Sequence, residues 1–233
     1  MMAGLLLAPV LVVILVVAGY VYFSAKPTPT AGHSPAPPRR TAAALASPTP
    51  TLGPWKHIDS RAQDPVPLTV NELFPQQFSV SGAAGTRTVD KANTNCSREV
   101  FGSALAAAVR KAHCTQVLRA SYLSTDHKLM ATVGVLNLSV TTPPSMWRRV
   151  TGSAEFIKQL PAAHGPTRNL SKGTGIEEAE VKGHYLILIW TEFSDLKAPK
   201  GNSQRKQLEA FSAGLISGTA NVSLTKRMVT GKP

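Results

Sequence analysis

Residues 184–194, HYLILIWTEFS, contain an unbroken run of apolar side chains, YLILIW. A run of this length predicts a β-strand, and apolar side chains at every position predict that the strand is buried on both of its faces. Residues 130–138 show nearly the same pattern. We therefore expect both faces of the sheet to be covered. Helices would form one cover, and the other would be the segment around Leu73, Phe74 and Phe78, a partner subunit or a ligand.

The strand at 184–194 belongs to a larger pattern. Residues 175–183, GIEEAEVKG, precede it with strand character. Residues 203–222, SQRKQLEAFSAGLISGTANV, follow it with a helical spacing of apolar side chains, and Ser203 is the expected N-cap of that helix. The C-terminal part of the chain therefore forms a ββα unit.

Another ββα unit lies upstream. Residues 115–124 and 128–140 have strand character and are separated by a short hairpin connection, Thr125-Asp126-His127. Residues 143–160, PPSMWRRVTGSAEFIKQL, start with prolines suited to a first helical turn and predict a helix weakened at Gly152. The predicted fold class is therefore α+β, with an antiparallel sheet built from two tandem ββα units.

A helix is expected before these two units. Residues 97–113, SREVFGSALAAAVRKAH, place apolar side chains among alanines and two cations in the last turn, where they suit the helix dipole. Further upstream, Thr69 and Glu72 match a capping box for a short helix that Pro75 ends. Residues 78–95 join the two helices and are interpreted as a polar, glycine-containing connection.

The chain has two cysteines, Cys96 and Cys114. In an exported domain, an even pair without CxxC spacing predicts a disulfide more than a metal or redox site. A straight helix between them would separate their Cα atoms by roughly 27 Å, whereas a disulfide needs less than about 7 Å. If the two cysteines pair, the helix must therefore break. Gly102 is the expected place, with residues 97–101 folding back as a separate turn.

The N-terminal residues 1–23 are almost all apolar and carry no charged side chain. A helix of their length matches the hydrocarbon core of a bilayer, which is about 30 Å thick. They predict a transmembrane anchor, and the alternative is a cleaved signal peptide. A signal peptide would have a shorter apolar region. The best cleavage site lies after Ala25 and has the bulky Phe23 three residues before the cut, where a small residue is usual, so the retained anchor is favoured.

Residues 24–67 are rich in Pro, Ala and Thr and predict a disordered linker, in which Trp55 is either a docking residue or a bystander. The remaining residues, 68–233, are the predicted α+β domain. Because Lys26 and Arg39 follow the apolar segment and no basic residue precedes it, the positive-inside rule alone would leave this domain in the cytoplasm. The linker composition and the cysteine pair favour the opposite orientation. We therefore expect a single-pass membrane protein with an extracytoplasmic domain.

The chain carries a formal net charge of +12. Its basic residues occur singly or in pairs, without a long run and without aromatic interleaving, so nucleic acid is not an expected partner. Basic charge of this kind favours anionic membrane or envelope surfaces. The expected partners are the membrane, through the anchor, and an envelope polymer or another exported protein.

Catalytic signatures are not found in the sequence. There is no HExxH, GxSxG, P-loop or EF-hand pattern, and no catalytic, metal-binding or cofactor-binding residue is predicted. Ser194 and Ser203 each begin an SxxK match, and residues 172–175, KGTG, loosely match a motif of penicillin-recognising enzymes. Two SxxK matches within ten residues indicate that the pattern arises easily by chance.

Glu177, Glu178 and Glu180 form the acidic cluster of the sequence. They could hold a cation or a basic ligand. Consecutive side chains of a strand point to opposite faces, however, so the solvated face of an edge strand is the favoured interpretation.

A resemblance to a known group of proteins rests on the predicted anchor, the linker and residues 95–138. The last of these segments reads NCSREVFGSALAAAVRKAHCTQVLRASYLSTDHKLMATVGVLNL. Together these segments resemble uncharacterised membrane-anchored exported proteins of high-GC Gram-positive bacteria. The resemblance covers most of the chain from about Leu68 and implies no activity, so no functional residue is carried over. A looser similarity is to the extracytoplasmic sensor domains of bacterial receptor kinases, which pair a stalk with a disulfide-bearing α+β domain.

These observations lead to two expectations of function. The first is a noncatalytic binding, scaffolding or sensor-like module of the cell envelope. The sequence predicts a folded domain on a spacer but contains no recognised catalytic pattern. The alternative is an envelope hydrolase with an unrecognised active site, which would require titratable groups to converge in a pocket near His113, His127, His164 and His184.

Overall fold

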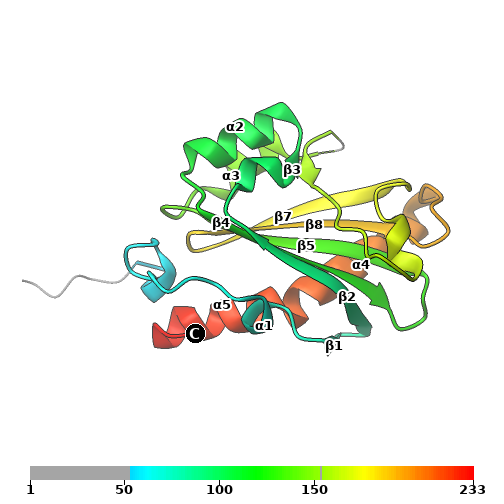
Figure 1. The fold of residues 1–233 in the computed structure, drawn as a ribbon, viewed down its shortest axis with the longest axis horizontal. Coiled ribbons are helices and arrows are strands. Elements are labelled where there is room, and N and C mark those ends of the chain that lie inside the picture. The colour runs from blue at the N-terminus through cyan, green and yellow to red at the C-terminus, as the bar shows by residue number, and fades with distance from the viewer. Residues whose placement is uncertain (1–52, 153) are drawn as a thin grey trace, which may run out of the picture. The chain divides into compact units, whose positions relative to one another are not determined.

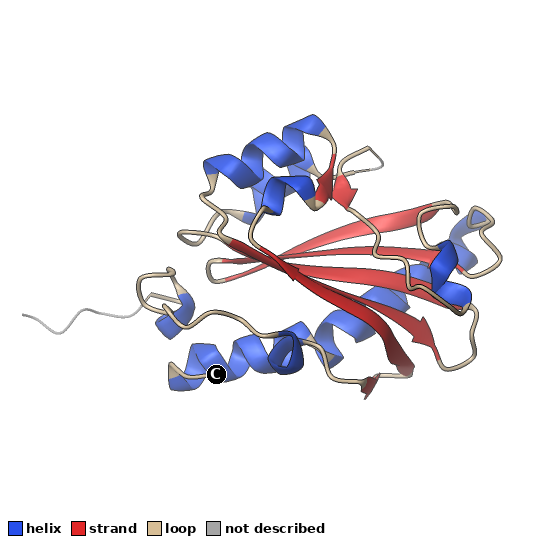
Figure 2. Ribbon diagram, in the orientation of Figure 1, coloured by secondary structure: helices blue, strands red, loops and turns tan. Residues whose placement is uncertain are grey.

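The computed structural model describes residues 53–152 and 154–233. Six strands form one antiparallel sheet in the order β1-β2-β4-β5-β8-β7, and β3 pairs with β6 in a separate two-stranded sheet (Figure 1; Figure 2). The strands are β1 (Gln77–Val80), β2 (Ala83–Asn93), β3 (Val100–Phe101), β4 (Gln116–Ser124), β5 (Leu129–Asn137), β6 (Phe156–Ile157), β7 (Gly175–Lys182) and β8 (Tyr185–Phe193). The α-helices are α1 (Val70–Leu73), α2 (Ser103–Lys111), α3 (Pro144–Val150), α4 (Gly201–Gly218) and α5 (Ala220–Thr230). Short 3-10 helices are η1 (Lys56–Ile58), η2 (Cys96–Arg98) and η3 (Pro166–Asn169).

The predicted anchor at residues 1–23, and the predicted linker as far as residue 52, lie outside the described residues. Within residues 53–152 and 154–233, no helix combines the length and the apolar character that a membrane span requires.

The stretch HYLILIWTEFS forms strand β8, which pairs with β5 on one side and β7 on the other. Every residue from Tyr185 to Glu192 is buried, so burial on both faces is confirmed. The hairpins β4–β5 and β7–β8 are also confirmed, and with them the antiparallel α+β fold.

The predicted connection at residues 78–95 is wrong. These residues form most of β1 and β2, a hairpin that adds two strands to the edge of the sheet. Strand β2 pairs with β4 from Gly85 opposite Ser124 to Asn93 opposite Val117. Because most β2 side chains are exposed or half-exposed, the sequence contains no apolar run from which a strand could be recognised. The backbone pairing with β4 stabilises this strand instead.

One face of the sheet is covered by α1, α4 and α5, which we call the α4–α5 cover (Figure 1). Leu73, Phe74 and Phe78 are buried in the same core, so the predicted contribution of the N-terminal segment is confirmed. This segment does not cover the face alone, because Phe211 and Leu215 of α4 pack into the same cluster.

The opposite face is covered by α2, α3, β3 and β6 (Figure 2). We call the described residues of 94–114 and 144–173 the α2–α3 cover. Its core joins Leu105 and Trp147 to Leu186 and Leu188 of β8. Helices thus contribute to both covers of the central strands.

Cys96 and Cys114 form a disulfide, with their Cα atoms 6.1 Å apart. The predicted break at Gly102 is confirmed, because α2 begins only at Ser103. Gly102 has a φ of 92°, a conformation that favours glycine, and a side chain there would collide with the carboxylate of Glu155. That carboxylate accepts hydrogen bonds from the backbone N–H groups of Ala104 (3.1 Å) and Leu105 (2.8 Å) in the first turn of α2. The predicted helix at 97–113 is therefore too long at its N-terminal end.

Other helix boundaries also differ from the predictions. The capping box of Thr69 and Glu72 is confirmed. The helix predicted at 143–160 ends at Val150 and is followed by strand β6. Helix α4 begins at Gly201 without a side-chain cap, so Ser203 lies inside the helix and is not its N-cap.

The folded part begins before Leu68, which differs from the predicted domain boundary. Ile58 is fully buried, and Trp55 packs against the same core, which confirms the docking alternative for this residue. The backbone N–H of His184 donates to the carbonyl of Ile58 (2.9 Å), so η1 is fixed to the sheet. Residues 53–67 are therefore part of the α4–α5 cover.

Arg227 of α5 holds this N-terminal segment in place and is fully buried. Its guanidinium donates to the carboxylates of Glu72 (2.8 Å) and Asp64 (2.7 Å) and to the carbonyl of Val66 (2.7 Å). The hydroxyl of Tyr185 donates to the other oxygen of Asp64 (2.6 Å). A buried cation with this many acceptors is well compensated, and it joins α5, α1 and the central strand.

We expect an Arg227→Met variant to lose about 3–5 kcal/mol of the free energy of unfolding, because the buried Asp64 and the partly buried Glu72 would keep their charges without a partner. Urea denaturation followed by circular dichroism measures this loss. The matched control is Lys226→Met, an exposed neighbour on the same helix, which should change stability by less than about 0.5 kcal/mol. A loss below about 1 kcal/mol for Arg227→Met would contradict the assigned role.

We expect the full chain, denatured without reductant, to show no reactive thiol, since both cysteines are paired. Replacing Cys96 and Cys114 together by alanine should lower the free energy of unfolding by about 3 kcal/mol, because the 18-residue separation closes a loop of moderate length. Reduction of the parent protein should cause a similar loss. Equal stability of the oxidised parent and the double variant would show that the disulfide contributes nothing.

Candidate functional site

Three aromatic rings from distant parts of the chain pack against one another on the side of the α2–α3 cover. The ring centroids of Phe101 in β3 and Phe156 in β6 are 4.8 Å apart, with their planes at 11°. Phe156 continues to Trp190 of β8, with centroids 4.4 Å apart. The exposed fraction falls from 50% for Phe101 to 7% for Trp190. The rings therefore form a ladder that leads from the surface down to the sheet.

The ladder forms one wall of a hollow of about 600 Å³, which we call the aromatic hollow. The other residues around it are polar or small: Ala154, Lys158, Gln159, Ser171, Gly173 and Thr174. A large apolar surface with a few hydrogen-bonding groups at its rim is the usual composition of a small-molecule site. The hollow is therefore the leading candidate for a functional site.

A buried carboxylate lies directly behind this hollow. Glu192 has no exposed surface, and its Oε2 accepts a hydrogen bond from the indole N–H of Trp190 (2.7 Å). Burial raises the pKa of Glu192, whereas the bonds from Trp190 and from the backbone of Ser171 and Gly173 act in the opposite direction. Its Oε1 has no partner of normal hydrogen-bond geometry. Glu192 fixes the plane of the Trp190 ring from behind.

Buried polar contacts attach the outer part of the ladder to the sheet. Arg119 of β4 forms a buried ion pair with Glu99 and donates to the carbonyl of Lys158 (2.8 Å). The backbone N–H of Lys158 donates to the carbonyl of Glu99 (3.0 Å). Further along, the hydroxyl of Ser121 donates to the carbonyl of Leu160 (2.7 Å). The segment that carries Phe156 is therefore fixed at several points.

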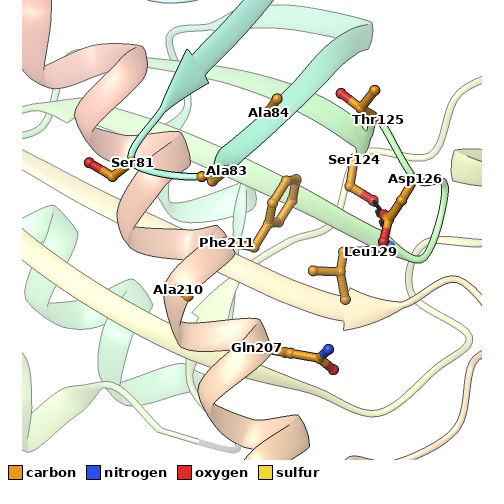
Figure 3. Close-up of a pocket in the computed structure, with 11 residues that line it drawn as sticks. Ser81, Ala83, Ala84, Ser124, Thr125, Asp126, Leu129, Gln207, Ala210 and Phe211 are labelled. Atoms are coloured by element: carbon orange, nitrogen blue, oxygen red, sulfur yellow. Dashed lines mark hydrogen bonds between the residues drawn. The ribbon is translucent and has the colours of Figure 1, made fainter.

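Another hollow, of about 410 Å³, lies on the α4–α5 side of the sheet. Figure 3 shows Phe211 and Leu129 at its apolar part and Asp126 on the turn between β4 and β5. Hydrogen bonds from the hydroxyl of Ser124 (2.7 Å) and the backbone N–H of Lys128 (3.1 Å) hold the pKa of Asp126 below its usual value. This carboxylate is already engaged within its own turn, so the hollow is the weaker candidate.

The acidic cluster predicted from the sequence does not converge. Glu177 faces the α2–α3 cover, near Thr151, whereas Glu178 faces Arg205 and Glu209 of α4. The three glutamates are half-buried, which differs from the predicted solvated face. Burial, followed by the charge of a neighbouring glutamate, raises the pKa of Glu177 and of Glu178 to about 7.

The other sequence candidates also remain apart. His184 is buried with its Nδ1 2.9 Å from the carbonyl of Ile58, whereas His127 lies in the turn between β4 and β5. The hydroxyl of Ser194 donates to the backbone of His127 (2.6 Å), and Ser203 is exposed on α4. Across residues 53–152 and 154–233, no three His, Cys, Asp or Glu side chains gather as metal ligands would.

Sequence reasoning did not identify the aromatic hollow. Its parts lie in β3, β6, β8 and the loop before β7, and the strands β3 and β6 have only two residues each. The KGTG stretch does contribute Gly173 and Thr174 to the wall, but neither SxxK serine lines it. The sequence around Phe101 does not indicate that its ring packs against Phe156 and, through it, is connected to Trp190.

Comparisons with protein-family models, with curated proteins and with solved structures found no match for this chain.

We expect a Glu178→Gln variant to be more stable than the parent at pH 8 but not at pH 5. The folded-state pKa of about 7 lies above the ordinary value of 4.5, so the folded protein binds this proton more tightly than the unfolded chain does. In the parent protein, the stability that comes from this tighter proton binding is fully present below pH 4.5 and is lost as the pH rises through 7. Removing the charge should recover about 1 kcal/mol at pH 8, because solvent screening reduces the effect of a half-buried group. Denaturation at both pH values measures this, and an equal gain at both would contradict it.

Proposed function

We propose that this protein is anchored in the membrane by residues 1–23 and that its folded part, outside the cytoplasm, is a noncatalytic binding module of the cell envelope. The aromatic hollow would hold a saccharide unit of an envelope polymer. The anchor and the orientation rest on the N-terminal sequence, and the binding role rests on the ladder of Phe101, Phe156 and Trp190.

The open face of Phe101 supports this proposal most directly. The side chain is half exposed although Phe156 stacks on it, so the ladder ends in a ring with one free face. A pyranose ring has a flat apolar face of C–H groups that can stack there, in the way that aromatic side chains bind other flat apolar surfaces. Ser171, Thr174 and Gln159 supply donors and acceptors for its hydroxyl groups.

The position of the hollow in the fold agrees with a module on a spacer. The chain enters the described part beside η1, where the ring of His57 lies against Gly231, so both ends of this part are close together. The carbonyl of Ile58 accepts a hydrogen bond from the backbone N–H of His184, which directly precedes the first residue of β8, Tyr185. At about 3.3 Å per residue, Trp190 lies roughly 17 Å further along β8. The hollow therefore lies well away from the end of the described part that the predicted linker joins.

A hydrolase that uses the same hollow is the alternative, and one observation favours it. Burial raises the pKa of Glu192, as it does for general acids in glycoside hydrolases. Such enzymes generally need two carboxyl groups beside the scissile bond. Among the described residues, no carboxylate lines the aromatic hollow, and Glu192 is enclosed behind Trp190. This arrangement supports binding over hydrolysis.

We expect the full chain, in non-ionic detergent, to bind at least one of the neutral oligosaccharides of glucose, galactose, mannose or N-acetylglucosamine. Phe101→Ala should weaken that binding by roughly 2- to 10-fold, the effect of losing one aromatic stacking contact. Calorimetric titration measures the affinity, with the exposed Val229→Ala on α5 as the matched control. Binding of none of the sugars, or no effect of Phe101→Ala, would contradict the proposal. Release of reducing ends would instead favour the hydrolase.

A further inference from the structure

The α2–α3 cover presents positive charge almost alone to solvent. Its exposed basic side chains are Arg98, Arg110, Lys111, Arg148, Arg149, Lys158, Arg168 and Lys172. The same described residues contain two acidic side chains, Glu99 and Glu155. Eight basic and two acidic residues give this layer a net charge of +6, half of the +12 of the whole chain.

Neither acidic side chain of this layer forms an ion pair with one of its exposed cations. Glu99 is buried in its ion pair with Arg119 and also accepts a hydrogen bond from Asn93 (2.6 Å). Glu155 is occupied by the backbone N–H groups at the start of α2. The exposed cations of the cover therefore have no carboxylate partner within the layer, and their mutual repulsion favours an external polyanion.

The aromatic hollow opens within this basic surface. Lys158 lines the hollow, and Lys172 lies next to Gly173 on its wall. Phe101, the outermost ring, belongs to the same layer as Arg98 and Arg110. A polymer with one ring in the hollow would continue over a layer whose exposed charges are mostly positive.

The α4–α5 cover differs in the way its charges are arranged. Arg205 of α4 pairs with Glu209 at 3.2 Å, and Glu178 lies next to this pair. Lys182 of β7 donates to Asn221 of α5 (3.2 Å), whose amide in turn donates to Glu180 (3.1 Å). Some charges on this side are thus paired with opposite charges, and its exposed lysines serve as a matched control for the basic residues of the opposite face.

We infer that the ligand of the aromatic hollow is an anionic glycan, in which sugar rings carry carboxylate or phosphate groups, and that the α2–α3 cover binds several of these charges. This inference rests on the proposed function and specifies its ligand. A ring stacks on Phe101, Lys158 holds an anionic group at the rim, and the arginines of α3 meet further groups along the chain. Neutralising a polyanion releases its condensed counterions, so the affinity depends steeply on salt.

The test uses two pairs of probes that differ only in charge. Polygalacturonate is compared with its methyl ester, and phosphomannan with neutral mannan, on the full chain in non-ionic detergent. At about 50 mM salt, at least one anionic form should bind roughly 10-fold more tightly than its neutral counterpart, and this affinity should fall roughly 10- to 100-fold by about 200 mM. The two pairs distinguish carboxylate from phosphate as the preferred anion.

Two double variants locate the charged contact. Arg148→Gln with Arg149→Gln should weaken binding of the anionic form several-fold and reduce its salt dependence, with little effect on the neutral form. The control, Lys206→Gln with Lys226→Gln, removes the same charge from exposed positions on α4 and α5 and should have a smaller effect.

The outcomes separate this inference from the function on which it rests. Equal binding of charged and neutral forms, both weakened by Phe101→Ala, would overturn the anionic glycan and leave the saccharide module intact. Equal losses from the two double variants would overturn the role of the α2–α3 cover. If poly-uridylate binds as tightly as the anionic glycans and Phe101→Ala changes nothing, the surface binds polyanions in general, and both the inference and the proposed hollow fail.

Discussion

The whole fold depends on strands β4, β5 and β8 being buried on both faces. The side chains of β8 alternate between two apolar clusters, with Ile187 and Ile189 in one and Leu186 and Leu188 in the other. Exposing either set to water would cost about 25 cal/mol per Å² of apolar surface. The sheet is therefore stable only with two covers, and the rest of the chain provides them.

The two covers are fixed by different chemistry. Arg227 attaches the α4–α5 cover through Asp64 and Glu72, and this cluster is complete, because every donor of the guanidinium has an acceptor close by. The α2–α3 cover is fixed by the disulfide and by the buried pair of Arg119 and Glu99. Under it, Ser121 and Thr132 form a polar band across the sheet, and Glu192 extends the band towards the end of β8. The face that carries this polar band is also the face with the aromatic hollow, the proposed binding site.

On the α2–α3 side, the contacts that stabilise the cover also position the proposed binding site. Strand β3 has two residues and pairs only with β6, so the position of Phe101 depends on its anchors on either side. Cys96 lies shortly before it, and Gly102, packed against Glu155, directly follows it. Because the ladder continues through Phe156 to Trp190, the contacts that hold the cover also shape the hollow.

The sequence by itself determined the features that depend on neighbouring residues. The apolar runs of β5 and β8, the hairpin at Thr125-Asp126-His127, the capping box of Thr69 and Glu72, and the break at Gly102 all follow from local pattern and chain geometry. Only the tertiary structure decided the polar strand β2, the inclusion of residues 53–67, the buried Arg227 and the ladder of Phe101, Phe156 and Trp190. In these cases the stabilising partner lies far away in the chain, up to 163 residues for Arg227 and Asp64, so no local periodicity records the contact.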